Sequence, residues 1–155
     1  MKLKFGAGAS RGPKLYCVFN KTEESFLGMK IRRADTEWSR LRGLLGKSRL
    51  DSGEGLWIVP SQGIHTVGMA FSIDVLFLDG NDRVIHAIEH FPPFRVSSVR
   101  LNCVSILELP PHTIYNSQTH VGDQLLICEP HEVNVCLQNS SPETPAPLPE
   151  EAVKE

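Results

Sequence analysis

Short apolar runs separated by turn-forming residues dominate the chain. Runs of Val, Ile, Leu and Phe bounded by Gly, Pro, Asn and Asp are typical of β-strands joined by turns. The strongest hairpin signal is the segment 79–82, Asp-Gly-Asn-Asp, because these residue types tolerate the positive φ angles of tight turns. We predict strands at 15–20, 26–31, 56–59, 73–78, 83–90, 103–109, 124–128 and 133–137, the last two forming a hairpin around Pro130.

One segment has a clear helical period. After Asp35 and Thr36, either of which suits an N-cap, apolar residues recur at spacings of three and four, and Gly46 would end the helix. The pattern predicts a buried stripe of Trp38, Leu41, Leu44 and Leu45. We therefore expect a mainly-β fold, a β-sandwich or barrel, with one short helix in the N-terminal half.

The predicted strand at 73–78 contains one acid, Asp74, among apolar residues. An unpartnered carboxylate there would cost several kcal/mol, so it should be paired, protonated or placed where it acts. By position in the sequence, we expect its partner to be Arg42, His65 or Thr66. Arg suits the role best, because a guanidinium pairs with a carboxylate through two hydrogen bonds.

Length and composition predict one domain of residues 14–138. The chain has 155 residues, enough for one core. Residues 1–13 resemble a flexible leader without the pattern of a secretory signal, and residues 139–155 combine prolines with acids, which favours disorder.

Charge and hydropathy exclude two classes of partner. The formal net charge is −2, whereas proteins that bind nucleic acid or anionic membranes usually carry a basic excess. No apolar run approaches the roughly 20 residues that span a bilayer. We therefore expect a cytoplasmic monomer that binds neither nucleic acid nor membrane. The basic cluster is then a solvated, ion-paired surface rather than a phosphate or nucleic-acid site, and it comprises Arg32, Arg33, Arg40, Arg42, Lys47 and Arg49.

Four cysteines and one histidine motif are the candidates for a metal or redox site. Cys17, Cys103, Cys128 and Cys136 form no C-x-x-C pair and sit among apolar residues, which favours free, buried thiols. The segment 86–90 reads His-Ala-Ile-Glu-His, the letters of an inverted zinc-peptidase motif. That motif needs a helix, and on a strand its two histidines would lie about 13 Å apart. We predict a strand here, with no metal and no cofactor.

Several stretches together resemble the DUF192 family of small domains. The resemblance covers roughly residues 15–128 and rests on 34–46, 53–56, Ile64-His65-Thr66 with Met69, 73–79, 107–110 and Gly122-Asp123. It implies a compact, mainly-β, jelly-roll-like domain and no established activity. Many family members carry Trp-Met-Lys-Asn where this chain has His65-Thr66-Val67-Gly68, so the chain is similar to the branch with Ile-His-Thr.

A small set of polar residues forms the candidate site. Its centre is His65 with Asp74, because a carboxylate that holds an imidazole is the orienting half of many acid–base sites. A structural bond that ties the glycine-containing loop to the sheet is the alternative. On an alternating strand Glu108 is expected to be exposed, and Asp123 after Gly122 is expected in a turn. The candidate site comprises Arg42, His65, Thr66, Asp74, Glu108 and Asp123.

Two hypotheses of function follow. The first is a module without catalytic activity that binds a small ligand or a protein partner near His65 and Asp74. The second is a small hydrolase or lyase in which His65 acts as the acid–base group and Asp74 orients it. A purely structural module is a third, weaker alternative. A nucleophile or third metal ligand beside His65 would favour the enzyme, and the sequence places none there.

Overall fold

The computed structural model describes residues 13–139 of the chain. In order, its elements are β1 (Leu15–Asn20), β2 (Ser25–Ala34), α1 (Glu37–Arg42), β3 (Glu54–Ile58), β4 (Ile73–Leu78), β5 (Val84–Phe91), β6 (Ser105–Leu109), α2 (Thr113–Ser117), β7 (Leu125–Cys128) and α3 (Val133–Gln138). The predicted flexible leader and most of the predicted tail lie outside the described residues.

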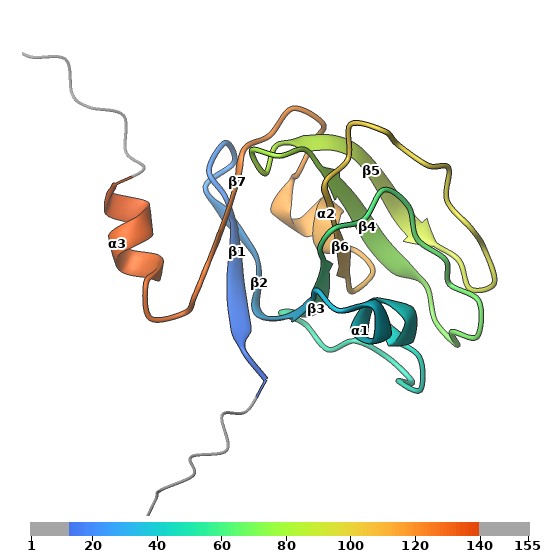
Figure 1. The fold of residues 1–155 in the computed structure, drawn as a ribbon. Helices are drawn as coiled ribbons and strands as arrows, with labels where there is room; N and C mark the ends of the chain where they lie inside the picture. Colours follow the sequence, from blue (N-terminus) through green and yellow to red (C-terminus); the bar gives the residue numbers. More distant parts are fainter. Residues whose placement is uncertain (1–12, 140–155) are drawn as a thin grey trace, which may run out of the picture.

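All seven strands of the described residues belong to one curled sheet that forms a half-barrel (Figure 1). The strand order is β5-β4-β6-β3-β2-β1-β7. Only β2 and β3 pair in parallel, and the other neighbours are antiparallel. The expected mainly-β fold is confirmed, as one open, curled sheet.

Both faces of the sheet are covered, and each carries its own hydrophobic core. Alternate residues of β4 divide between the two cores, Val75 and Phe77 on one face and Leu76 and Leu78 on the other. This explains why β4 reads as a continuous apolar run. The first core, which contains Val75, also includes Leu44, Leu50, Ile64 and Met69 from the connecting segments.

Helix α1 is shorter than its sequence pattern suggests. Thr36 caps it as predicted, with its hydroxyl accepting from the amide of Ser39 at 3.1 Å. The helix ends before Gly43, which has a φ of 46° and turns the chain. Leu44 therefore follows the helix and is buried as expected, but the predicted stripe is wrong for Trp38 and Leu45, which are 72% and 37% exposed. The side chain of Leu41 lies outside the described part of the structure.

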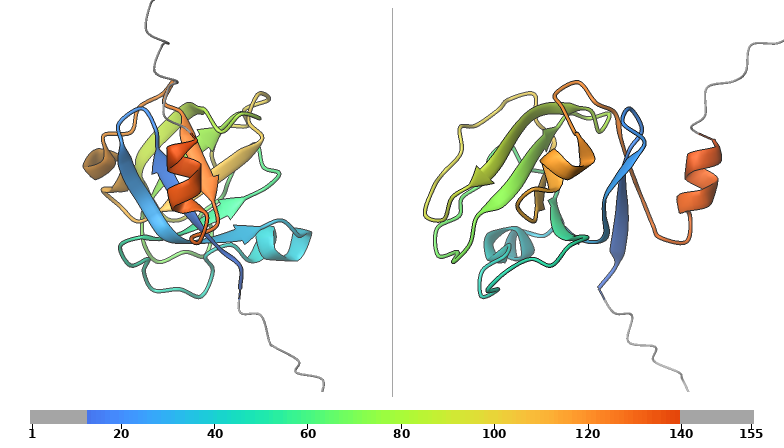
Figure 2. Two further views of the ribbon diagram at one scale, coloured as in Figure 1. Left: turned by 90° about the vertical axis from the view of Figure 1, so that its left-hand side faces the viewer. Right: turned by 180° about the vertical axis from the view of Figure 1, so that it is seen from behind.

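The predicted C-terminal hairpin is wrong. β7 pairs with β1 at the edge of the sheet, and the segment from Val133 forms α3 instead of a strand. A helix satisfies its own backbone, as in the bond from the Cys136 amide to the Glu132 carbonyl at 2.8 Å, so the segment needs no strand partner. Figure 2 shows α3 at the β7 end of the molecule, away from α1. None of the described helices is long and apolar enough to cross a membrane.

The histidine motif and the cysteines follow the sequence-based expectation. His86 and His90 lie on β5, so the helical spacing that a shared zinc ion would need is missing. None of the four cysteines forms a disulfide. Cys17, Cys103 and Cys128 are buried, and desolvation raises the pKa of each of these three thiols.

Candidate functional site

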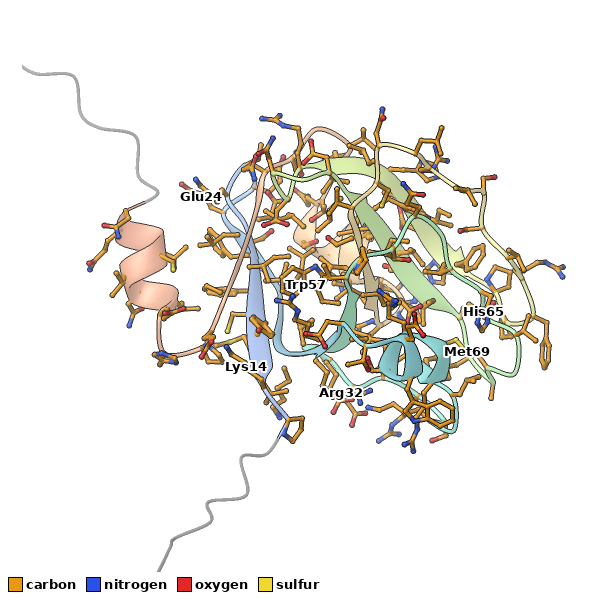
Figure 3. The ribbon with its side chains drawn as sticks, in the orientation of Figure 1. Lys14, Glu24, Arg32, Trp57, His65 and Met69 are labelled. Atoms are coloured by element: carbon orange, nitrogen blue, oxygen red, sulfur yellow. The ribbon has the colours of Figure 1, made fainter. Side chains whose placement is uncertain are left out.

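A cavity of about 470 Å³ lies between α1, the segment 60–69 and strands β3 and β6. Figure 3 shows His65 and Met69 on the same side of the molecule as α1. The walls of the cavity are polar and apolar in similar measure, and its charged side chains come from α1 and β6. The lining residues used below are Arg40, Arg42, Leu44, Leu45, Ile64, His65, Met69 and Glu108.

Glu108 is the most buried charged residue of this cavity. It lies on β6 between β3 and β4, with Leu56 and Val75 as its cross-strand neighbours. Only 3% of the residue is exposed, and its Oε2 atom has no hydrogen-bond partner among the described residues. Burial raises the pKa of Glu108 to about 8, so the carboxyl is mainly neutral at pH 7.

The expectation of an exposed Glu108 is wrong because β6 is a central strand. Alternation does place Glu108 on the face opposite Leu107, but that face is covered by α1 and the connecting segments. Strands β3 and β6 also approach closely here. A Cβ on Gly55 would lie 2.7 Å from the Glu108 carbonyl oxygen, so this position requires glycine.

Two arginines of the predicted basic cluster reach the same cavity. Arg40 is half-buried and donates to the Pro60 carbonyl at 3.4 Å, and Arg42 is exposed. Neither forms an ion pair with a described acid. Other members of the cluster do: Arg33 pairs with Asp35 at 3.2 Å, Lys47 with Glu54 at 3.2 Å and Arg49 with Asp51 at 2.9 Å.

Asp74 has different partners from those the sequence suggested. Its carboxylate is fully buried and accepts from the backbone amide of His90 at 3.0 Å and from that of Ile114 at 2.9 Å. The bonds join β4 to β5 and to the first turn of α2. The predicted bond from Arg42, His65 or Thr66 is absent within the described structure, so Asp74 and His65 do not form an acid–base pair.

Thr66 fixes a neighbouring loop rather than a ligand. Its buried hydroxyl donates to the Pro92 carbonyl at 2.7 Å and accepts from the Arg95 amide at 3.0 Å. These bonds hold the segment 92–95 against the chain beside His65. His65 itself is exposed, and its backbone bridges to Val96.

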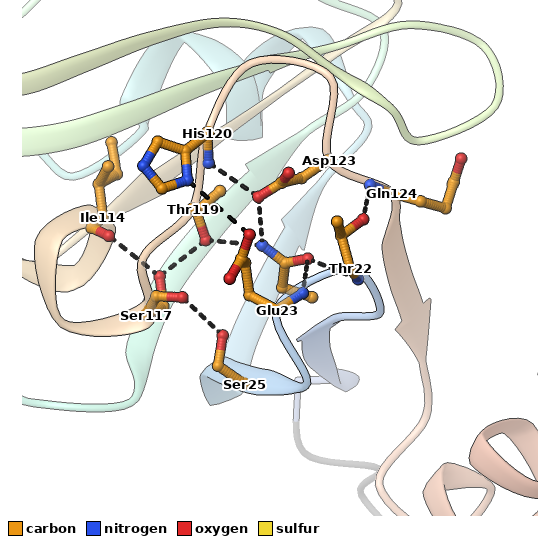
Figure 4. A network of polar contacts seen from close by, with 10 residues as sticks. Thr22, Glu23, Ser25, Ile114, Ser117, Thr119, His120, Asp123 and Gln124 are labelled. Carbon is orange, nitrogen blue, oxygen red and sulfur yellow. Dashed lines mark hydrogen bonds and ion pairs between the residues drawn. The ribbon is translucent and has the colours of Figure 1, made fainter.

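Asp123 belongs to a separate polar network, on the β1–β2 turn (Figure 4). It lies in a turn as expected and is buried, accepting from the side chain of Asn20 at 2.8 Å and from the backbone amide of His120 at 2.8 Å. Side-chain ligand atoms of Glu23, His120 and Asp123 lie within 4.8 Å of one another, a spacing that one cation could bridge. The hydrogen bonds show what the cluster does for the fold: they tie the first hairpin to the segment before β7.

The structure thus brings half of the candidate residues together. Arg42, His65 and Glu108 line one cavity, whereas Thr66, Asp74 and Asp123 are not among its lining residues. Sequence reasoning missed the role of Arg40 and Met69 in this cavity. It also missed a pair of exposed histidines, His90 and His112, whose Nε2 atoms lie 3.3 Å apart. These histidines belong to separate segments that Asp74 holds together through the amides of His90 and Ile114. No local signal in the sequence could therefore have found the pair.

A family model matches residues 18–127 of the chain, and that family is DUF192, described as "Uncharacterized ACR". The chain belongs to the DUF192 family. A UPF0127 protein from Thermococcus sibiricus (strain DSM 12597 / MM 739) is 28% identical over 113 residues, which cover 70% of this chain and 72% of that protein.

Two solved structures share the fold of this DUF192 domain. One, from Sinorhizobium meliloti 1021, is named as a candidate transcription regulator; its TM-score is 0.65 at 15% identity, covering 76% of this chain and 95% of that one. The other, a protein of unknown function from Novosphingobium aromaticivorans DSM 12444, has a TM-score of 0.64 at 14% identity, covering 81% and 99%. At this identity the likeness establishes the fold alone.

Three of the six stretches that carried the DUF192 resemblance meet at the cavity. The stretch 34–46 supplies the arginines of α1 and the turn after it, the Ile-His-Thr stretch supplies Ile64, His65 and Met69, and the stretch 107–110 supplies Glu108. Segments far apart in the sequence therefore build a single hollow.

Proposed function

We propose that this DUF192 domain binds a small molecule in the Glu108 cavity and acts as a binding module rather than as an enzyme. The observation that carries the proposal is a buried carboxyl group whose Oε2 atom has no hydrogen-bond partner within residues 13–139. Leaving a buried polar group unpaired costs about 1–3 kcal/mol, so such groups are rare in a core that serves folding alone. A ligand that hydrogen-bonds Glu108 would offset this cost.

The size and lining of the cavity support the same function. Small-molecule sites are typically clefts of about 300–1,000 Å³ with apolar walls and a few polar groups. This cavity of about 470 Å³ falls in that size range and combines apolar residues, which include Leu44, Ile64 and Met69, with a similar share of polar surface. Among its polar residues, Glu108 and the two arginines would orient a ligand.

An acid–base enzyme is the second candidate, on the strength of one observation. A carboxyl whose pKa burial has raised to about 8 is suited to donate a proton near neutral pH. In that case Glu108 itself, and not His65 with Asp74, would transfer the proton. Loss of turnover with retained ligand binding in Glu108→Gln would favour this candidate.

A fragment screen by ligand-observed NMR tests the binding proposal. We expect fragments that bind the wild type to shift the amide signals of Leu44, Ile64 and Met69, and to lose affinity in Glu108→Leu. Glu89→Gln is the matched control, because Glu89 is an exposed acid of the same sheet, on β5, which β4 separates from β6. A screen without binders, or with binders whose affinity Glu108→Leu leaves unchanged, would contradict the proposal.

A further inference from the structure

We infer that the ligand of the Glu108 cavity is a small organic anion with an apolar body, a conclusion that rests on the proposed binding function. Its charged group, a carboxylate or a phosphate, would bind the arginines that follow one another along α1. Its apolar body would lie along Leu44, Ile64 and Met69, with Glu108 as the hydrogen-bond donor at the buried end.

The charges that face the cavity favour an anion. Its titratable lining residues are Glu37, Arg40, Arg42, His65 and Glu108. Because Glu108 is mainly neutral at pH 7, the two guanidinium groups outweigh the one ionised acid, Glu37. The cavity therefore does not repel an anion, although it contains two glutamates.

The distribution of ion pairs within the basic cluster also supports an anionic ligand. Three of the four cluster members outside this cavity, Arg33, Lys47 and Arg49, are each bonded to an acid. The fourth, Arg32, forms no ion pair with a described acid and lines the neighbouring groove with Arg42. Arg40 and Arg42, which line it, are not paired with any acid in the described structure. Guanidinium groups without carboxylate partners are free to bind a carboxylate or phosphate through two hydrogen bonds.

A second hollow extends this basic surface. A groove of about 460 Å³ shares Arg42, Gly43 and Leu45 with the first cavity and is lined further by Arg32, Arg33 and Lys47. No acid lines it. Arg42 thus stands where the cavity that contains Leu44, Ile64 and Met69 meets a basic groove, an arrangement that suits a molecule with one charged end.

Four probes with six carbon atoms each test the charge preference: hexanoate, hexyl phosphate, hexanol and hexylamine, each titrated against the full chain by NMR. We expect the better of the two anions to bind at least about tenfold more tightly than hexanol, as one charge-assisted hydrogen bond allows. The comparison of hexanoate with hexyl phosphate identifies the head group. The shifted amides should include Gly43 and Leu45.

Two variants test whether Arg42 causes the preference for the anion. Arg42→Gln should reduce the preference for the anion to near parity while leaving hexanol binding unchanged. Arg49→Gln should retain it, because Arg49 is paired with Asp51 and lines neither hollow. Both positions are exposed, so both variants should fold.

The outcomes separate the two proposals. Equal binding of hexanol and the anions, or tightest binding of hexylamine, overturns the anion class but leaves a ligand-binding cavity. If neither anion binds but uncharged fragments do, the anion class is likewise overturned and the ligand-binding cavity still stands. If no probe and no fragment binds, the binding function itself is overturned.

Discussion

Asp74 and Glu108 lie on adjacent strands, β4 and β6, and both are buried, yet their surroundings differ in one decisive respect. Asp74 receives two backbone hydrogen bonds, from His90 and Ile114, and lines no described cavity. The Oε2 of Glu108 receives none and lines a hollow. Burial alone therefore does not mark a functional acid. An acid that the fold satisfies stabilises the fold, and an acid that the fold leaves unsatisfied beside a cavity is available to a ligand.

The largest effect should come from Asp74→Ala, which leaves two buried amides without an acceptor. We expect a loss of about 3–5 kcal/mol in the free energy of unfolding, measured by urea denaturation. Asp74→Asn should lose less, about 1–3 kcal/mol, because one acceptor oxygen remains. A loss below about 0.5 kcal/mol for Asp74→Ala would contradict the structural role assigned to this acid.

Glu108→Gln should change the pH dependence of stability. Between pH 4.5 and about 8 the folded chain retains a proton on Glu108 that the unfolded chain has released, so the stability of the wild type should fall as the pH rises through this range. The slope of this contribution is up to about 1.4 kcal/mol per pH unit. Relative to the wild type, Glu108→Gln should gain about 2–4 kcal/mol between about pH 5 and pH 9.

Urea denaturation across that range measures the gain, with Glu89→Gln as the exposed control. Parallel stability curves for the wild type and Glu108→Gln would show that the carboxyl ionises normally. The contrast with Asp74 would then disappear.

The smallest effect concerns His65. Because Asp74 bonds only to backbone amides, His65→Ala should change stability by less than about 0.5 kcal/mol. In a double-mutant cycle with Asp74→Asn, the coupling energy should stay below about 0.5 kcal/mol. A coupling above about 1 kcal/mol would restore the His65–Asp74 pair that the sequence suggested.

Local signals in the sequence determined much of the fold. Turn residues and short apolar runs predicted all seven described strands within a few residues, and the Thr36 cap predicted the start of α1. These features depend on neighbours within a few positions, which a sequence displays directly. The prediction failed for α3, where the alternating residues Val133 and Val135 suggested a strand, but the segment forms a helix whose backbone hydrogen bonds are internal.

Tertiary structure alone decided which of the two buried acids finds hydrogen-bond donors and which does not. The sequence identifies Asp74 and Glu108 as acids in apolar strands, but their partners depend on residues brought from distant segments. Ile114 lies 40 positions from Asp74, and the walls around Glu108 come from α1 and the segment 60–69. Hydrogen bonding acts over a few ångströms in space and not along the chain. The sequence therefore supplied the candidate residues, and the folded chain path decided which of them share a cavity.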